Sequence, residues 1–157
     1  MPTVQLHVNG VQRAVDAWDA EMPLLYALRN ELGLHAAKFG CGLGQCGSCT
    51  VLLDDAPVRS CTVQVGEVDG RRVVTAEGLG TPERPHPVQA AFIAEQAAQC
   101  GYCTNGMVMS VVALLRREPR PSREQAQQAL AGNLCRCGSH DRVLRAVQRA
   151  ADAMRRA

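Results

Sequence analysis

The stretch KFGCGLGQCGSCTVLLDDAPVRSC, residues 38–61, gathers four cysteines. The first three lie in one short loop with the spacing C-x4-C-x2-C, and the fourth follows after eleven further residues. Residues 50–60 have the pattern of a β-hairpin, which would carry the chain back to the loop. The spacing therefore predicts one site built from Cys41, Cys46, Cys49 and Cys61.

The chemistry of this first site follows from the same spacing. C-x4-C-x2-C with a remote fourth cysteine is typical of plant-type [2Fe-2S] ferredoxins, whereas structural zinc sites usually pair two short knuckles. Glycine accepts the positive φ angles of a tight loop, and we expect them at Gly40, Gly42, Gly44 and Gly47. Loop amides, with Gly42, Gly44 and Gly47 as candidates, would hydrogen-bond to the cluster and raise its reduction potential.

A second group of cysteines comes from QCGYCTNGM and NLCRCGSHDRV, with the spacing C-x2-C, 31 residues, C-x-C. Its members are Cys100, Cys103, Cys135 and Cys137. C-x2-C is common to many metal sites, so structural zinc or a thiol cluster stays an alternative here. Predicted helices between the two pairs would bring the chain back, and Cys135 and Cys137 cannot share a helix face, so they should lie on an irregular segment. Both pairs stand just before predicted helices, whose N-termini suit a negatively charged cluster.

Composition narrows the classes of function. The chain has 157 residues, 17 Lys or Arg against 15 Asp or Glu, and few aromatic residues, which does not favour nucleic-acid binding. The N-terminus has no pattern of a signal peptide, and the longest nearly apolar run, residues 107–115, is too short to span a bilayer. A reducing cytoplasmic location is therefore the default expectation. Disulfides do not persist there, so the eight cysteines more readily bind metal.

The pattern of apolar residues predicts an α+β chain. Residues 1–78 show two hairpins, a helix at 23–32 and a last strand at 71–78, which indicates a β-grasp, ferredoxin-like domain. Residues 79–85 form a proline-rich linker. Residues 86–157 are expected to form a four-helix bundle. Its helices are predicted at 86–99, at 105–118, after a capping box opened by Ser122, and from about 141 to the end.

At these residues the chain resembles the iron–sulfur component of the molybdenum hydroxylases, the xanthine dehydrogenase and aldehyde oxidase family. CGLGQCGSCTV, QCGYCTNGM and NLCRCGSHDRVLRAV occur in the family's order and spacing, and the resemblance covers nearly the whole chain as a separate small subunit. The resemblance implies two [2Fe-2S] clusters. It also implies that the chain is an electron-transfer subunit that holds no catalytic residue.

The resemblance further implies a division of roles between the two sites. Cys41, Cys46, Cys49 and Cys61 would hold the distal, more exposed cluster, and Cys100, Cys103, Cys135 and Cys137 the proximal one. The proximal cluster would lie next to a molybdopterin cofactor in a larger partner subunit, with Gln99 and Cys137 near the pterin. Electrons from hydroxylation of an N-heterocycle or aldehyde would then pass to an external acceptor, such as a cytochrome subunit.

Two departures from the family pattern are informative. Asn105 stands where the family commonly has proline, and Gly138-Ser139-His140 follows the last cysteine where T-G-Y is frequent. Both variants resemble the branch of nicotinate and isoquinoline dehydrogenases.

Two other interpretations of the whole chain stay open. One is a free-standing ferredoxin-like carrier whose second site holds zinc, and the other is a disulfide-stapled binding module. His140 is not expected to be a ligand, because eight cysteines already fill two clusters. Arg142, Arg145 and Arg149 are interpreted as a solvated basic face, with docking on an acidic partner as the alternative.

Overall fold

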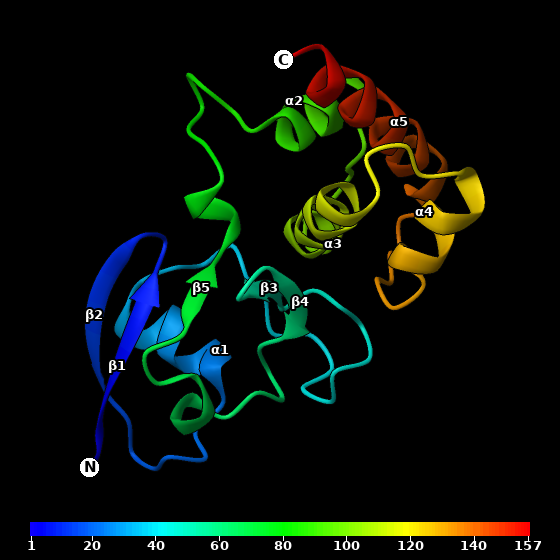
Figure 1. The fold of residues 1–157 in the computed structure, drawn as a ribbon. Helices are drawn as coiled ribbons and strands as arrows, with labels where there is room; N and C mark the ends of the chain where they lie inside the picture. The colour runs from blue at the N-terminus through cyan, green and yellow to red at the C-terminus, as the bar shows by residue number, and fades with distance from the viewer.

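The N-terminal half forms one mixed five-stranded sheet in the computed structural model, which describes residues 1–157 (Figure 1). The strands are β1 (Thr3–Val8), β2 (Val11–Asp16), β3 (Thr50–Leu53), β4 (Ala56–Arg59) and β5 (Arg72–Val74). Their order is β2-β1-β5-β3-β4, in which β1 runs parallel to β5 and the other neighbours are antiparallel. A ferredoxin-like sheet domain followed by helices is thereby confirmed.

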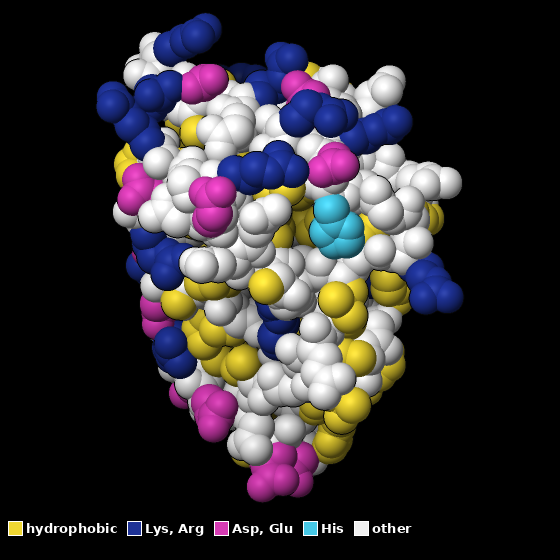
Figure 2. Space-filling model, turned by 90° about the vertical axis from the view of Figure 1, so that its right-hand side faces the viewer, with side chains coloured by type: hydrophobic (Ala, Val, Ile, Leu, Met, Phe, Trp, Pro, Cys, Tyr) yellow, Lys and Arg dark blue, Asp and Glu magenta, His cyan; other side chains and the backbone are white.

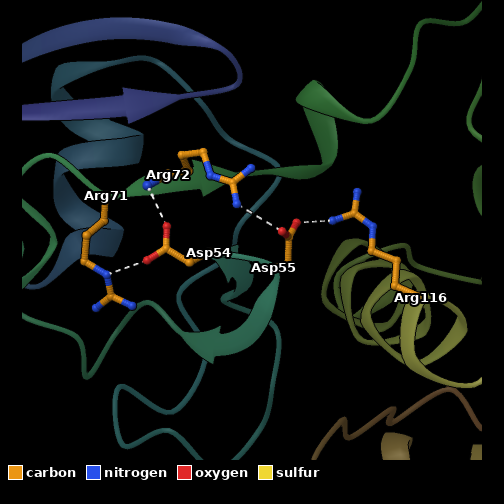
Figure 3. A network of polar contacts seen from close by, with 5 residues as sticks. All are labelled: Asp54, Asp55, Arg71, Arg72 and Arg116. Carbon is orange, nitrogen blue, oxygen red and sulfur yellow. Dashed lines mark hydrogen bonds and ion pairs between the residues drawn. The ribbon is translucent and has the colours of Figure 1, made fainter.

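Both predicted hairpins turn through left-handed residues. Asn9 and Gly10, with φ of 51° and 79°, join β1 to β2, and Asp54 and Asp55, with φ of 47° and 70°, join β3 to β4. Two successive positive φ angles match the right-handed twist of the flanking strands. The second turn lacks glycine, and its carboxylates are held by arginines from β5, its flanking turn and the helical half (Figure 3).

Two elements of the sheet domain differ from the predictions. The helix predicted at 23–32 begins as α1 (Leu24–Tyr26) and widens into a π-helical turn (Ala27–Glu31) that keeps Leu28 fully buried. The strand predicted at 71–78 pairs only over Arg72–Val74 and ends in a 3-10 turn (Ala76–Gly78). The strand stops because Thr75 leaves the ladder. Its N–H donates to Oδ1 of Asn9 at 2.9 Å, and its hydroxyl accepts from Nδ2 of Asn9 at 3.0 Å.

The C-terminal half contains four helices: α2 (Pro87–Ala94), α3 (Thr104–Arg117), α4 (Arg123–Leu130) and α5 (His140–Arg156). The capping box at Ser122 is confirmed, since its hydroxyl accepts from the N–H of Gln125 while the Gln125 side chain accepts from the N–H of Ser122. The helix predicted at 86–99 ends five residues early. Gln96 is left-handed with φ of 50°, and the N–H groups of Gln96 and Ala97 turn back to Ile93 and Phe92, as in a Schellman motif.

The two halves share one buried strand. All four residues of β3 are buried, because α3 lies across one face of the strand while the N-terminal core covers the other (Figure 1). Leu52 points into the helical core, where it joins side chains of α2, α3, α4 and α5. The loops that carry the cysteines leave the ends of these packed elements.

The basic face predicted on α5 is exposed, and part of it is ion-paired. Arg145 and Arg149 each pair with the carboxylate of Glu95, at the C-terminal end of α2, at 3.2 and 2.7 Å. The side chains of Arg145 and Arg149 are 57% and 56% exposed, so the predicted solvated basic face is confirmed, and these two members also form ion pairs. They tie α5 to the helix that leads into the second group of cysteines.

Candidate iron–sulfur sites

The loop around Cys41 and Cys46 is shaped by four glycines, which act in two ways. Gly42, Gly44 and Gly47 have φ of 67°, 71° and 80°, as the sequence predicts. Gly40 does not, so that expectation is wrong for this residue. Gly40 is required for space instead, because a Cβ there would lie 2.6 Å from Sγ of Cys46 and 2.7 Å from Oγ of Ser48.

Backbone amides of this loop converge on Cys41. The N–H groups of Leu43, Gln45 and Cys46 donate to its Sγ at 3.3, 3.2 and 3.4 Å. These donors, that of Leu43 foremost, lower the pKa of the Cys41 thiol to about 6. The loop therefore stabilises a negative sulfur, which is the ligand form that a metal cluster requires.

Of the three glycine amides expected to donate to the cluster, only that of Gly44 faces a cysteine sulfur in the protein. The N–H of Gly44 faces the thiol of Cys61 and lowers its pKa, although burial and the neighbouring Cys49 outweigh it and raise that pKa to about 11. The N–H groups of Gly42 and Gly47 have no sulfur partner in the protein. Their role as donors to a cluster stays a prediction.

The four cysteines of the first group meet in two pairs. Cys41 and Cys46 each donate a backbone N–H to the sulfur of the other at 3.4 Å. Cys49 and Cys61 are neighbours, since burial foremost and then Cys49 raise the pKa of the Cys61 thiol. The hairpin closes the second pair as predicted, since the N–H and hydroxyl of Ser60 both donate to the carbonyl of Cys49.

The second group is brought together by the ends of three helices. Cys100 follows α2, Cys103 is the residue on which α3 begins, and Cys135 and Cys137 lie on the irregular segment between α4 and α5, as expected. Its thiols also influence one another in pairs: Cys135 helps to raise the pKa of Cys103, and Cys137 helps to lower the pKa of Cys100.

The two thiols of the inner pair, Cys103 and Cys135, are shifted in opposite directions. Burial raises the pKa of Cys103 to about 12, with the hydrogen bond to Cys135 adding to it. Burial alone would also raise the pKa of Cys135, but hydrogen bonds from the hydroxyl and N–H of Ser139 help to lower it to about 6.

Pairs of thiols fit a two-iron cluster, in which four cysteines are divided between two metal ions. A structural zinc site instead needs four ligands around a single ion. Both groups of cysteines therefore fit the [2Fe-2S] cluster that the spacing predicts for the first group.

The two groups face one hollow of about 440 Å³ between the halves of the chain. Cys41 and Cys46 line it from the first group, and Cys100, Cys103 and Cys135 from the second. The carbonyl of Cys46 accepts a hydrogen bond at 2.9 Å from the N–H of Leu134, the residue before Cys135. This contact joins ligand loops that are almost ninety residues apart in sequence, and no local pattern could have predicted it.

Asn133 fixes the two loops against each other and was missed by the sequence interpretation. Its side chain is 2% exposed and spans the domains, because Nδ2 donates to the carbonyl of Gly47 at 3.2 Å and Oδ1 accepts from the hydroxyl of Ser110 at 2.8 Å. A buried amide that is hydrogen-bonded at both ends holds its neighbours at fixed distances. The only signal in the sequence is its place two residues before Cys135.

The cysteines of the two groups differ in exposure in the chain by itself, and the expected order of exposure in a complex with a partner stays a prediction. In the first group Cys49 and Cys61 are buried and the others half-buried, whereas in the second group Cys100 is exposed and the others half-buried. In the chain by itself the first group is thus the less exposed one. Gln99, expected near a pterin, is an exposed residue of the bend before Cys100.

Comparison with known domains gives each half a family. Residues 6–79 match the 2Fe-2S iron-sulfur cluster binding domain, and residues 75–148 match a separate family described as a [2Fe-2S] binding domain. The fold, the paired cysteines and these matches define a protein of two [2Fe-2S]-binding domains.

Relatives that match over nearly the whole length of both chains narrow the class of protein further. One subunit of the nicotinate dehydrogenase of Pseudomonas putida is 54% identical over 98% of this chain and 98% of its own length. One subunit of the isoquinoline 1-oxidoreductase of Brevundimonas diminuta is 45% identical over 94% of this chain and 97% of its own. The crystal structure of quinoline 2-oxidoreductase from Pseudomonas putida 86 contains a chain with a TM-score of 0.92 at 37% identity, covering 99% of this chain and 96% of that one. The chain belongs to the iron–sulfur subunits of the molybdenum hydroxylase family, which are parts of oxidoreductases.

None of the helices combines the length and the apolar composition that a bilayer crossing needs.

Proposed function

We propose that the chain is an electron-transfer subunit with two [2Fe-2S] clusters, one on each group of cysteines. The ligands would be Cys41, Cys46, Cys49 and Cys61 for the first cluster and Cys100, Cys103, Cys135 and Cys137 for the second. When bound, each such cluster takes up and gives up one electron. The chain's own residues hold the sulfurs, donate hydrogen bonds to them and keep the two ligand loops in contact.

One observation carries this proposal: the two groups of cysteines face the same hollow and are joined by the hydrogen bond between Leu134 and Cys46. Two unrelated metal sites would not need to meet. A relay does, because its two centres must stay close and at a fixed spacing. The clamp at Asn133 supports the same function.

The partner is proposed to be a larger subunit that holds a molybdopterin cofactor and covers the second group. The support is the exposure of apolar side chains there. Leu134 is 59% exposed and Tyr102 49% exposed, next to exposed Cys100 and Gln99. A ligand loop and its apolar rim are better shielded from water when a partner lies on them. The second cluster would then be the proximal one, with Gln99 and Cys137 toward the pterin.

The distribution of charged and hydrophobic side chains on the surface supports a partner that covers the second group of cysteines. On the face in Figure 2, Lys and Arg side chains gather over the helical half, and hydrophobic side chains concentrate in the middle and lower part. A partner would cover the apolar region and leave the charged end in water. The first cluster would be left to pass electrons to an external acceptor, for which a cytochrome subunit is one candidate.

The substrate class proposed for the complex is an N-heterocycle, ahead of an aldehyde. The support is that three relatives are named for nicotinate, isoquinoline and quinoline. We also propose that residues 1–78 form a β-grasp domain, residues 79–85 a linker and residues 86–157 a four-helix bundle. A cytoplasmic location is proposed as well.

Metal analysis tests the core of the proposal. The purified chain should contain about four irons and four acid-labile sulfides, and C61S and C103S should each lose about half of both. Two irons with one zinc would instead support the free-standing carrier, and a chain without iron would support the disulfide-stapled module. Purification with the neighbouring subunits tests the partner: L134E and Y102E should lower the yield of a molybdopterin-containing complex, while the matched change I93E on α2 should not.

A further inference from the structure

Ser139 stands at the N-cap of α5 and does not cap the helix. A serine at this position normally accepts a hydrogen bond from an N–H of the first turn. Ser122 does so at the start of α4, where its hydroxyl accepts from the N–H of Gln125 at 3.1 Å. Ser139 makes no such bond, and its Oγ lies 3.2 Å from Sγ of Cys135.

The proton of this hydroxyl has one acceptor. Ser139 is 7% exposed, and its Oγ has no hydrogen-bond partner in the protein other than the sulfur of Cys135. A buried hydroxyl without an acceptor is costly, and a metal-bound thiolate can only accept. With Cys135 deprotonated, the hydroxyl of Ser139 is therefore the donor.

The first group of cysteines has a similar serine with a different environment. Oγ of Ser48 lies 3.1 Å from Sγ of Cys46, but it also lies 3.3 Å from the carbonyl of Lys38, to which it donates. The single proton of Ser48 is shared between two acceptors. Ser139 gives its proton to sulfur alone, and it forgoes a helix cap to do so.

We propose that Ser139 is a positioning residue for Cys135 whose hydroxyl raises the reduction potential of the second cluster. This inference rests on the proposed function. Reduction adds negative charge that the ligand sulfurs share, so a hydrogen bond to sulfur stabilises the reduced state more than the oxidised one.

A higher reduction potential of the second cluster would favour one step of the electron transfer. The second cluster is proposed to receive electrons first, and a higher potential favours that step.

The test is a redox titration of the loaded full-length chain, followed by the electron paramagnetic resonance signal of each reduced cluster. S139A should lower the ratio of reduced to oxidised second cluster about three- to tenfold at the wild-type midpoint, where tenfold equals 59 mV for one electron. The first cluster should not change. S139T, which keeps a hydroxyl, should restore the potential, and S139V, its match in shape, should not.

Two control variants separate tuning from stability. S122A removes a working helix cap and should lower thermal stability without moving either potential. S48A should move only the first cluster, and by less than S139A moves the second. If S139A and S139V leave the second potential where it is, or if S139T and S139V shift it equally, the inference is wrong.

The proposed function fails separately from this inference. A wild-type chain with fewer than two clusters contradicts the function, whereas two clusters with potentials indifferent to Ser139 contradict only the inference. Should S139A fail to load the second cluster, the comparison of S139T with S139V still decides the question, because the two side chains differ only in the hydroxyl.

Discussion

Gly47 shows how a single residue can serve a ligand loop and a domain contact together. Its φ is 80°, and a Cβ there would lie 2.4 Å from the carbonyl oxygen of Gly132 and 2.6 Å from Nδ2 of Asn133. G47A should therefore lower the free energy of unfolding by more than the cost of a left-handed alanine, which is about 1–2 kcal/mol. It should also lower the iron content, as measured by denaturant unfolding and metal analysis.

The matched control is Gly70, which has φ of 71° but no atom within 4 Å of an added Cβ. G70A should show the cost of the backbone angle alone, with normal iron content. Equal losses in G47A and G70A would mean that the close approach of the two domains at Gly47 has no energetic weight.

Cys41 and Cys61 should differ in reactivity once the metal is removed. The thiolate is the nucleophile, and the pKa of about 6 at Cys41 makes most of it thiolate at neutral pH, whereas about 11 at Cys61 leaves it a thiol. In the folded, metal-free chain, alkylation of Cys41 should level off above about pH 7, while that of Cys61 should keep rising. Mass spectrometry of iodoacetamide-treated chain at several pH values measures both profiles.

Urea provides the comparison for that experiment, because unfolding removes the amides of Leu43 and Gln45 from the sulfur. Both profiles should then coincide near the ordinary thiol pKa of about 8.5. Coinciding profiles without urea would show that the loop acquires its shape only when metal binds.

At the residue scale the sequence predicts the features that depend on local spacing. The grouping of the eight cysteines and the positive φ of Gly42, Gly44 and Gly47 are predicted from the pattern alone. Gly40 and Ser139 do not, since the first is set by a sulfur several residues away in a folded loop and the second by the choice between a helix cap and a thiol. Such choices depend on which partner the fold brings closest.

At the scale of elements, Glu95 links the end of α2 to α5 through ion pairs. This carboxylate is 17% exposed and pairs with Arg145 and Arg149, and Arg149 foremost holds its pKa below the ordinary value. A lowered folded pKa means that the pair stabilises the fold above the ordinary pKa of glutamate. That contribution is lost as the pH falls through the lowered value.

E95Q should therefore reduce stability at neutral pH and lose its effect in acid. Urea midpoints of the variant and the wild type, measured between about pH 3 and pH 7, should converge as the pH falls. D152N is the control, because Asp152 pairs with Arg155 one turn away on an exposed face, where a pair of this kind contributes little. A constant difference for E95Q across that range would rule out the ion pairs as its cause.

The boundaries of elements were harder to predict than their existence. All four helices of the C-terminal half are where apolar period and capping residues indicate. The early end of α2 depends on Gln96, which takes a left-handed angle more common for glycine or asparagine. The short β5 depends on Asn9, more than sixty residues away, whose side chain replaces the ladder at Thr75.

At the scale of the whole molecule, the decisive contacts join residues far apart in sequence. Asp55 in a hairpin turn binds Arg116 at the end of α3 at 2.5 Å (Figure 3). Nη2 of Arg59 donates to the carbonyl of Gly132 at 3.0 Å. Periodicity predicts two domains and is silent on how they meet. The spacing between the two ligand groups is therefore a property that only the folded chain reveals.

Asn133 should control that spacing. N133L has a side chain of similar size but leaves the buried hydroxyl of Ser110 without its acceptor, at about 1–3 kcal/mol. It also removes the donor that joins Asn133 to the carbonyl of Gly47, which keeps its hydrogen bonds from Thr50. The loops of Cys46 and Cys135 should then hold their cysteines with less restraint, because the N–H of Leu134 is next to the lost amide.

Two measurements check this prediction on chain loaded with both clusters. N133L should lower the free energy of unfolding by about 1–3 kcal/mol. It should also weaken the magnetic interaction between the two reduced clusters, or make it less uniform, in electron paramagnetic resonance. N105L is the control. Asn105 lies at the same interface, yet its amide reaches the carbonyl of Ala36 only at 3.4 Å. An N133L chain that is less stable while the interaction between its clusters is unchanged would assign Asn133 to stability alone, and the spacing of the relay to the Leu134–Cys46 bond.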